Sequence, residues 1–162
     1  MTTTRNFLGI PVDGDITRAE PRTRQRPLED FSPLLQAVLD DPLVTEFGWR
    51  QFTPYFNDGD PCVFGAGSVW VRTCDDGEDA DRDALDVEYH ATLSPRRWNA
   101  KAVRYEDIER APEKAALYVH CEALAKAVDS GEFDDVLPEA FGDHADITVK
   151  RDGITVEFYE HD

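Results

Sequence analysis

The sequence predicts an α+β domain in which a mainly antiparallel sheet, built from hairpins, is covered on one face by helices. Two observations indicate this fold class. Asp-Gly turn signals stand between apolar runs at Asp58-Gly59 and Asp152-Gly153, and this dipeptide favours a two-residue hairpin. Two other segments, 33–41 and 112–130, space their apolar residues as a helix does.

The chain divides into an irregular or flexible N-terminal arm, residues 1–29, and a single α+β domain, residues 30–162. The arm holds three prolines and little apolar periodicity, so it offers no helix or strand pattern. Its five arginines and four acidic residues give a net charge of +1, against −17 for the whole chain. We expect the arm either to dock on an acidic surface of its own body or of a neighbouring subunit, or to remain a solvated linker.

Three helical segments are predicted. Ser32-Pro33 is typical of a helix start and predicts a helix over 33–41. Pro112 and Gly131 bound a longer helix over 112–130, and a short helical turn over 137–141 is ended by Gly142. The apolar stripe of the long helix consists of Leu117, Cys121, Leu124 and Val128.

The remaining apolar patterns predict strands. Centring a hairpin on Asp58-Gly59 pairs Tyr55 with Cys62 and Thr53 with Phe64. A further strand is expected at 68–74. Alternation over 85–93 predicts a half-buried strand with His90 on its solvent face. A type I′ turn at Asp152-Gly153 pairs Val149 with Val156 and Ile147 with Phe158 on the core face.

The net charge of −17 argues against binding to nucleic acid or to anionic membranes. Salt adaptation and a GC-rich genome are the ordinary explanations of such acidity, and an acidic DNA-mimic inhibitor is the sharper alternative. Three cysteines are too few for a disulfide framework, and no apolar run has the length of a signal peptide or a membrane span. We therefore expect a cytoplasmic protein.

Trp49–Phe64 is the stretch with the densest aromatic, proline and turn residues. Polar groups beside an aromatic wall are typical of a small-ligand pocket or a metal-assisted site, whereas the same Asn and Asp residues also make an ordinary turn. The candidate ligand-binding residues are Trp49, Gln51, Tyr55, Asn57, Asp58, Asp60 and Cys62.

A second, weaker candidate is a basic cluster around Trp98. It consists of Arg96, Arg97, Lys101 and Arg104, which could bind an anion or simply balance nearby acidic residues. The chain has no Gly-rich phosphate loop and no G-x-S-x-G elbow, and Cys62, Cys74, His90 and His120 lack zinc-site spacing. We therefore expect no catalytic residue, metal ligand or cofactor.

The pattern W-x-Q-x-T-P-Y-F-N-D-G-D-P-C-x-F resembles a motif of an uncharacterised family of small bacterial and phage proteins. F-G-D-H at 141–144, and the R-D-G turn leading to Tyr159-Glu160-His161-Asp162, look like the closing part of the same family. The resemblance covers residues 31–64 and 133–162. It implies a shared fold and an association with bacteria or phages, and it carries over no catalytic residue.

The leading functional expectation is a non-catalytic accessory or interaction protein that works through its acidic surface and an exposed aromatic hairpin. Its partner would be another protein or a second copy of the chain. The alternative is a small-ligand-binding protein or metal-assisted enzyme with its site at the Tyr55–Cys62 turn.

Overall fold

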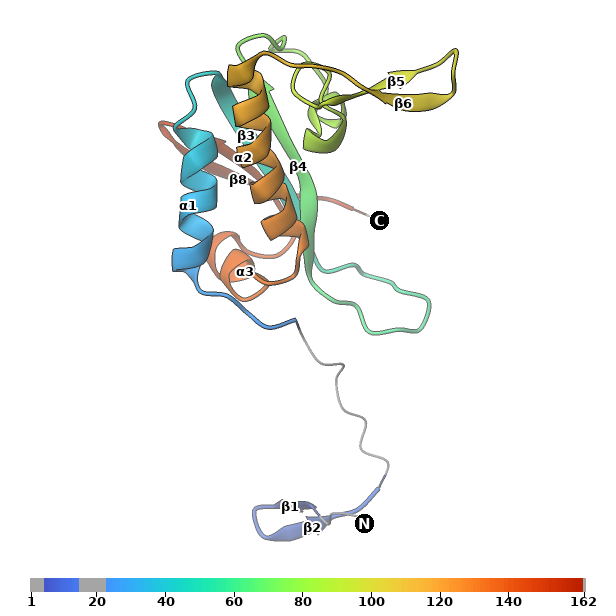
Figure 1. The fold of residues 1–162 in the computed structure, drawn as a ribbon. Coiled ribbons are helices and arrows are strands. Elements are labelled where there is room, and N and C mark those ends of the chain that lie inside the picture. The colour runs from blue at the N-terminus through green and yellow to red at the C-terminus, as the bar shows by residue number, and fades with distance from the viewer. Residues whose placement is uncertain (1–4, 15–22, 162) are drawn as a thin grey trace.

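The computed structural model describes residues 5–14 and 23–161, and it has an α+β fold (Figure 1). Within these ranges it contains three α-helices, eight β-strands and two short 3-10 helices. In chain order the elements are β1 (Arg5–Phe7), β2 (Ile10–Val12), α1 (Leu28–Leu39), β3 (Val44–Phe52), β4 (Gly65–Thr73), η1 (Arg82–Leu85), η2 (Val87–Tyr89), β5 (Arg96–Asn99), β6 (Arg104–Asp107), α2 (Pro112–Asp129), α3 (Val136–Phe141), β7 (Ala145–Lys150) and β8 (Gly153–Phe158).

The main sheet has four antiparallel strands in the order β4-β3-β7-β8. Helices α1 and α2 lie side by side on one face of it, with α2 packed on β4 and α1 on β3 (Figure 1). Two ribbons, β1–β2 and β5–β6, form separate two-stranded sheets. The predicted fold class, an antiparallel sheet with helices on one face, is therefore confirmed.

The core is centred on β3, which has a strand on each side. Phe47, Trp49 and Gln51 point to the helices and are fully buried. Gly48 lies between them, and a Cβ there would collide with the backbone carbonyl of Ile147. The glycine therefore lets β3 approach β7 closely.

The first hairpin lies deeper in the sheet than the sequence predicts. Its strands are β3 and β4, and residues 53–64 form a loop rather than paired strands. The pairs Phe52↔Gly65 and Gln51↔Ala66 nevertheless continue the register that Tyr55–Cys62 predicts. The loop stays unpaired because Pro54 and Pro61 have no N–H to donate. The strand predicted at 68–74 corresponds to residues 68–73 of β4.

The strand predicted over 85–93 is wrong. This segment contains the last residue of η1, all of η2 and the turn after it. The carboxylates of Asp81 and Asp86 accept hydrogen bonds from the N–H groups of Asp83 and Glu88 at the starts of η1 and η2. Such side-chain-to-backbone bonds compete with a strand ladder. His90, predicted to face solvent, is fully buried, with Nε2 2.9 Å from the carbonyl oxygen of Val71.

The C-terminal hairpin is present, but its predicted register is wrong by two residues. Val149 pairs with Ile154 and Ile147 with Val156, so the turn is Arg151-Asp152. Arg151 holds the turn in place, because its guanidinium donates to the carbonyl oxygens of Val44 and Asp41 at 2.7 and 2.5 Å. A shift by two keeps the apolar residues on one face.

The helices agree with the sequence more closely. α2 is confirmed with its stripe of Leu117, Cys121, Leu124 and Val128 fully buried. α3 ends at Gly142 as predicted. α1 begins at Leu28, five residues before the predicted start, and keeps Pro33 inside it. None of the described helices is long and apolar enough to cross a membrane.

Part of the predicted arm, residues 1–4 and 15–22, lies outside the described residues. Where no strand was expected, residues 5–12 form the β1–β2 ribbon. The end of the arm contacts the body: Gln25 donates to the carbonyl oxygen of Gly131 at 2.8 Å, and the Arg26 guanidinium lies 3.4 Å from Glu132. Whether the domain begins at residue 30 stays a prediction.

Candidate functional site

The structure divides the candidate ligand-binding residues between the core and the surface. Trp49 and Gln51 are fully buried under the helices. Trp49 Nε1 donates to Gln51 Oε1 at 3.0 Å, and Gln51 Nε2 donates to the carbonyl oxygens of Leu137 and Gly142 at 2.9 and 2.6 Å. These two side chains therefore hold α3 and the turn after it against the sheet.

The other candidates lie in the exposed loop after β3. Asn57 closes the loop tip on itself, because its side chain donates to the Pro61 carbonyl at 3.2 Å and its own carbonyl accepts from the Asp60 N–H at 2.7 Å. Asp58 and Gly59 adopt positive φ there. The side chains from Asn57 to Cys62 are exposed. This loop tip is a self-contained turn, and the ligand-binding role of its residues stays a prediction.

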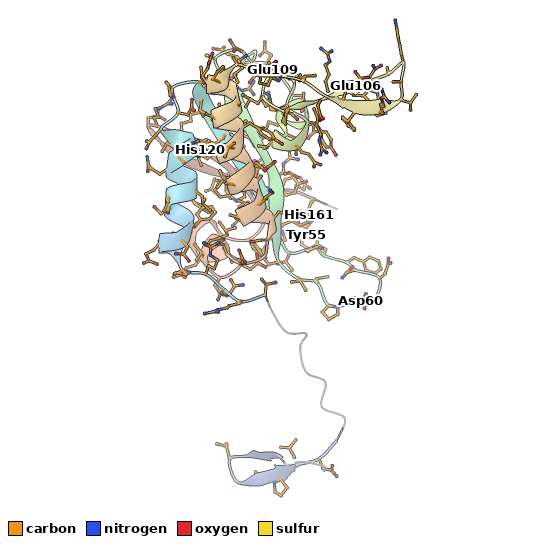
Figure 2. The ribbon with its side chains drawn as sticks, viewed as in Figure 1. Tyr55, Asp60, Glu106, Glu109, His120 and His161 are labelled. Atoms are coloured by element: carbon orange, nitrogen blue, oxygen red, sulfur yellow. The ribbon has the colours of Figure 1, made fainter. Side chains whose placement is uncertain are left out.

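Tyr55 is the exception, because it packs against residues that the sequence analysis did not select. Its ring is parallel to the His161 ring at a centroid distance of 4.5 Å and lies 5.0 Å from the His144 ring. Phe52 packs on His161 at 4.1 Å. Figure 2 labels Tyr55 and His161 next to each other, beside the lower end of β4. We call Phe52, Tyr55, His144 and His161 the aromatic–histidine cluster.

The cluster joins three segments that are distant in the chain. They are the T-P-Y part of the opening motif, F-G-D-H at 141–144, and the segment after β8 that ends in Tyr159-Glu160-His161. Spacing alone does not connect these segments, so the sequence offered no independent signal for His144 and His161.

Asp143 fastens the loop to this cluster. Its carboxylate accepts hydrogen bonds from the backbone N–H and the hydroxyl of Thr53, both at 2.7 Å. Burial by itself would raise the pKa of Asp143, but these bonds, the His144 N–H and the nearby His144 ring together lower it. The ionised carboxylate is thus part of the folded arrangement.

A cavity of about 480 Å³ lies elsewhere, between α2, β4 and the segment after η1. Its charged lining consists of Asp86, Glu88, Glu122, Asp129, Arg96 and Lys126. Burial raises the pKa of Asp86. Burial, and to a lesser extent the negative charge of Glu122, raises the pKa of Tyr118. Lys126 is 3.0 Å from Glu122, so part of this charge is already neutralised.

The basic cluster is spread over the β5–β6 ribbon, which projects from the body (Figure 1). Arg96 lines the 480 Å³ cavity, whereas Arg97 lies opposite Glu106 in the register of the two strands. Trp98 and Tyr105 meet edge to face on the ribbon at 5.1 Å and are half exposed. The anion-binding role of Arg96, Arg97, Lys101 and Arg104 stays a prediction.

The remaining reactive side chains are dispersed. No group of three potential metal-ligating side chains converges among residues 5–14 and 23–161. Cys62 and Cys74 are exposed, and Cys121 is buried in the core, where burial raises the pKa of its thiol to about 12. Such a thiol remains protonated and does not act as a nucleophile at neutral pH.

One further surface has no counterpart in the sequence analysis. β8 is the edge strand of the sheet and is exposed along its length. Ile154 and Val156 are 46% exposed and Phe158 is 71% exposed, although they lie on the same face as the buried residues of β7.

Comparison with family models, with curated proteins and with solved structures finds no match for this chain.

Proposed function

We propose that the protein is a non-catalytic interaction protein that binds an extended, basic segment of a partner protein along β8. The observation that carries this proposal is the exposed edge of β8, which offers apolar side chains and backbone hydrogen-bonding groups together. Strand addition at a sheet edge is a common way to recognise a peptide.

The backbone groups that face outward can be identified from one hydrogen bond. The Tyr159 N–H donates to the His144 carbonyl at 2.7 Å, so the backbone of Tyr159 points to β7. Because direction alternates along a strand, Thr155 and Glu157 also point to β7, whereas Ile154, Val156 and Phe158 point outward. The N–H and C=O groups that no strand of the described residues uses thus belong to the residues with exposed apolar side chains.

The side chains add specificity to this edge. Ile154, Val156 and Phe158 are the cross-strand partners of Val149, Ile147 and Ala145, which are buried under the helices. A strand added beside β8 would extend this apolar face by one row. Its own apolar residues at alternate positions would then cover the exposed side chains.

Charge favours a basic partner over a second copy of the chain. Two copies would bring a net charge of −17 each to the same interface, which opposes their association. A basic segment would be attracted, and its alternate side chains would lie on the face that carries Glu157. An enzyme at the Tyr55–Cys62 turn has less support, because Trp49 and Gln51 lie in the core.

The test uses a synthetic peptide of alternating lysine and valine and backbone amide NMR. We expect shifts confined to β8 and slower hydrogen exchange at Ile154, Val156 and Phe158, with binding that weakens as salt is raised. Val156→Pro should abolish binding while the protein stays folded, because it removes an outward N–H and no ladder bond. Thr155→Val, on the opposite face, is the matched control and should bind normally.

Three results would overturn the proposal. One is equal binding of a peptide in which glutamate replaces lysine, and another is unchanged binding by Val156→Pro. The third is self-association, seen as an average molecular mass that rises with protein concentration in the wild type but not in Val156→Pro. That result would show that β8 binds a second copy of the chain.

A further inference from the structure

We propose that His144 and His161 form a two-histidine binding site for a divalent transition-metal ion. The proposal does not rest on the partner-binding role of β8, although the His144 ring lies 5.9 Å from the Phe158 ring at the end of that strand. It rests on the geometry of the two rings, on the carboxylate beside one of them and on the side chains that hold them.

The two rings present one nitrogen each to the same point. His144 Nδ1 lies 2.7 Å from His161 Nε2, the ring centroids are 4.9 Å apart, and the ring planes differ by 18°. A nitrogen separation so much shorter than the centroid separation means that the rings meet head to head, nearly in one plane. In this state one nitrogen donates a proton and the other accepts it.

A metal ion can take the position of the proton between the two nitrogens. Neutral imidazole nitrogen is the commonest metal ligand in proteins and suits Zn²⁺, Ni²⁺ and Cu²⁺. Two ligand bonds of the usual Zn–N length at cis or tetrahedral angles place the nitrogens about 2.9–3.3 Å apart. The two nitrogens would therefore separate by roughly 0.2–0.6 Å on binding, a small rotation of either side chain.

Asp143 favours the form of His144 that can act as a ligand. Its carboxylate lies 3.8 Å from His144 Nε2, the nitrogen on the far side of the ring from His161. A negative charge there favours the proton on Nε2 and leaves a lone pair on Nδ1. Carboxylates beside the outer nitrogen of a ligating histidine commonly orient it in this way. On binding, His161 moves its proton from Nε2 to Nδ1, so no proton is lost from either ring.

The surroundings hold the pair in place on the protein surface. Tyr55 stacks on both rings, and Phe52 packs on His161. Since no third metal-ligating side chain converges here among the described residues, the other coordination positions would be taken by water or by a small ligand. The acidic chain raises the local concentration of cations.

The experiment is a calorimetric titration of the untagged full-length protein with ZnCl₂ and with NiCl₂ at neutral pH. We expect one ion per chain, and a loss of at least about tenfold in affinity in both His144→Ala and His161→Ala. His120→Ala is the matched control, because His120 is exposed on α2, and its affinity should equal that of the wild type. In NMR spectra the ring protons of His144 and His161 should shift first.

Absence of saturable binding by the wild type would overturn the proposal. Unchanged binding in His161→Ala would also overturn it, because the acidic surface would then account for the ions. Circular dichroism separates these results from misfolding, and His161→Gln, which keeps the size and polarity of the side chain, should also lose binding if it folds.

Discussion

β3 and β8 share an alternating pattern of apolar and polar residues but have opposite surroundings. Both strands alternate apolar and polar residues, yet Phe47 and Trp49 of β3 are fully buried whereas Ile154 and Val156 of β8 are half exposed. The difference comes from position, because β3 has a strand on each side and a helix layer above it, whereas β8 is an edge strand. Alternation therefore predicts a strand and its faces, but the neighbours decide how much of a face is buried.

The largest expected effect is at Gly48. Gly48→Ala would place a methyl group against the backbone of Ile147, where neither β3 nor β7 can move away easily. We expect a loss of about 4 kcal/mol or more in the free energy of unfolding, measured by urea denaturation. Gly153→Ala is the comparison on β8, where nothing lies within 4 Å, although its φ of +157° adds some strain. An effect at Gly153 as large as that at Gly48 would contradict the comparison.

Gln51→Ala should have the next largest effect. It leaves Trp49 Nε1 and the carbonyl oxygens of Leu137 and Gly142 without their partner in the core. We expect a loss of about 3–5 kcal/mol, measured by thermal and urea unfolding. Gln36→Ala on the exposed face of α1 is the matched control and should change stability by less than about 0.5 kcal/mol. Equal losses in the two variants would show that Gln51 is not a core tether.

Asp143→Asn tests the contact between the end of β3 and the turn before β7. Since the pKa of Asp143 is lowered in the folded state, its ionised form stabilises the fold above the ordinary carboxyl pKa. That contribution is lost as the pH falls through the lowered pKa. The Tm difference between wild type and variant should therefore be largest at neutral pH and should shrink below about pH 4. A Tm difference that does not change with pH would contradict this assignment.

The smallest effect is expected on β8 itself. Val156→Thr should cost less than about 0.5 kcal/mol, because the side chain is already half exposed and threonine favours strands. Val149→Thr, on the buried face of β7, should cost about 1–3 kcal/mol because it buries a hydroxyl. Urea unfolding of the pair checks the ranking, and a larger loss for Val156→Thr would reverse it.

Local signals predicted the three helices and the two hairpins of the main sheet, but not the β1–β2 and β5–β6 ribbons. α2 follows from Pro112, Gly131 and the stripe that includes Leu117. The two hairpins of the main sheet were predicted from Asp-Gly signals, although Asp58-Gly59 lies in the unpaired loop and the second turn is Arg151-Asp152. Errors arose where a distant group decides the outcome, or where side-chain bonds to the local backbone compete with a strand. Arg151 bonds to the carbonyls of Val44 and Asp41 and favours a turn one residue earlier than predicted, which shifts the pairing of β7 with β8 by two residues. The Asx turns at Asp81 and Asp86 replaced a strand that alternation alone indicated.

The candidate site was predicted less well, and the reason is again distance along the chain. Trp49 and Gln51 have the residue types of a ligand pocket, but only the location of α3 shows that their polar atoms are used in the core. Tyr55 was selected, whereas its partners His144 and His161 lie some 90 to 106 residues further along the chain. No spacing rule connects residues so far apart.

The pairing of β3 with β7 also has a consequence for how the chain folds during synthesis. Phe47 pairs with Val149, more than a hundred residues later, so β3 remains an edge strand until the C-terminal hairpin leaves the ribosome. Closing so long a loop is slow compared with forming α1, α2 or the β3–β4 hairpin. During that interval the edge of β3 that later pairs with β7 is unpaired. Exposed strand edges of this kind make partly folded chains prone to aggregate or to bind chaperones.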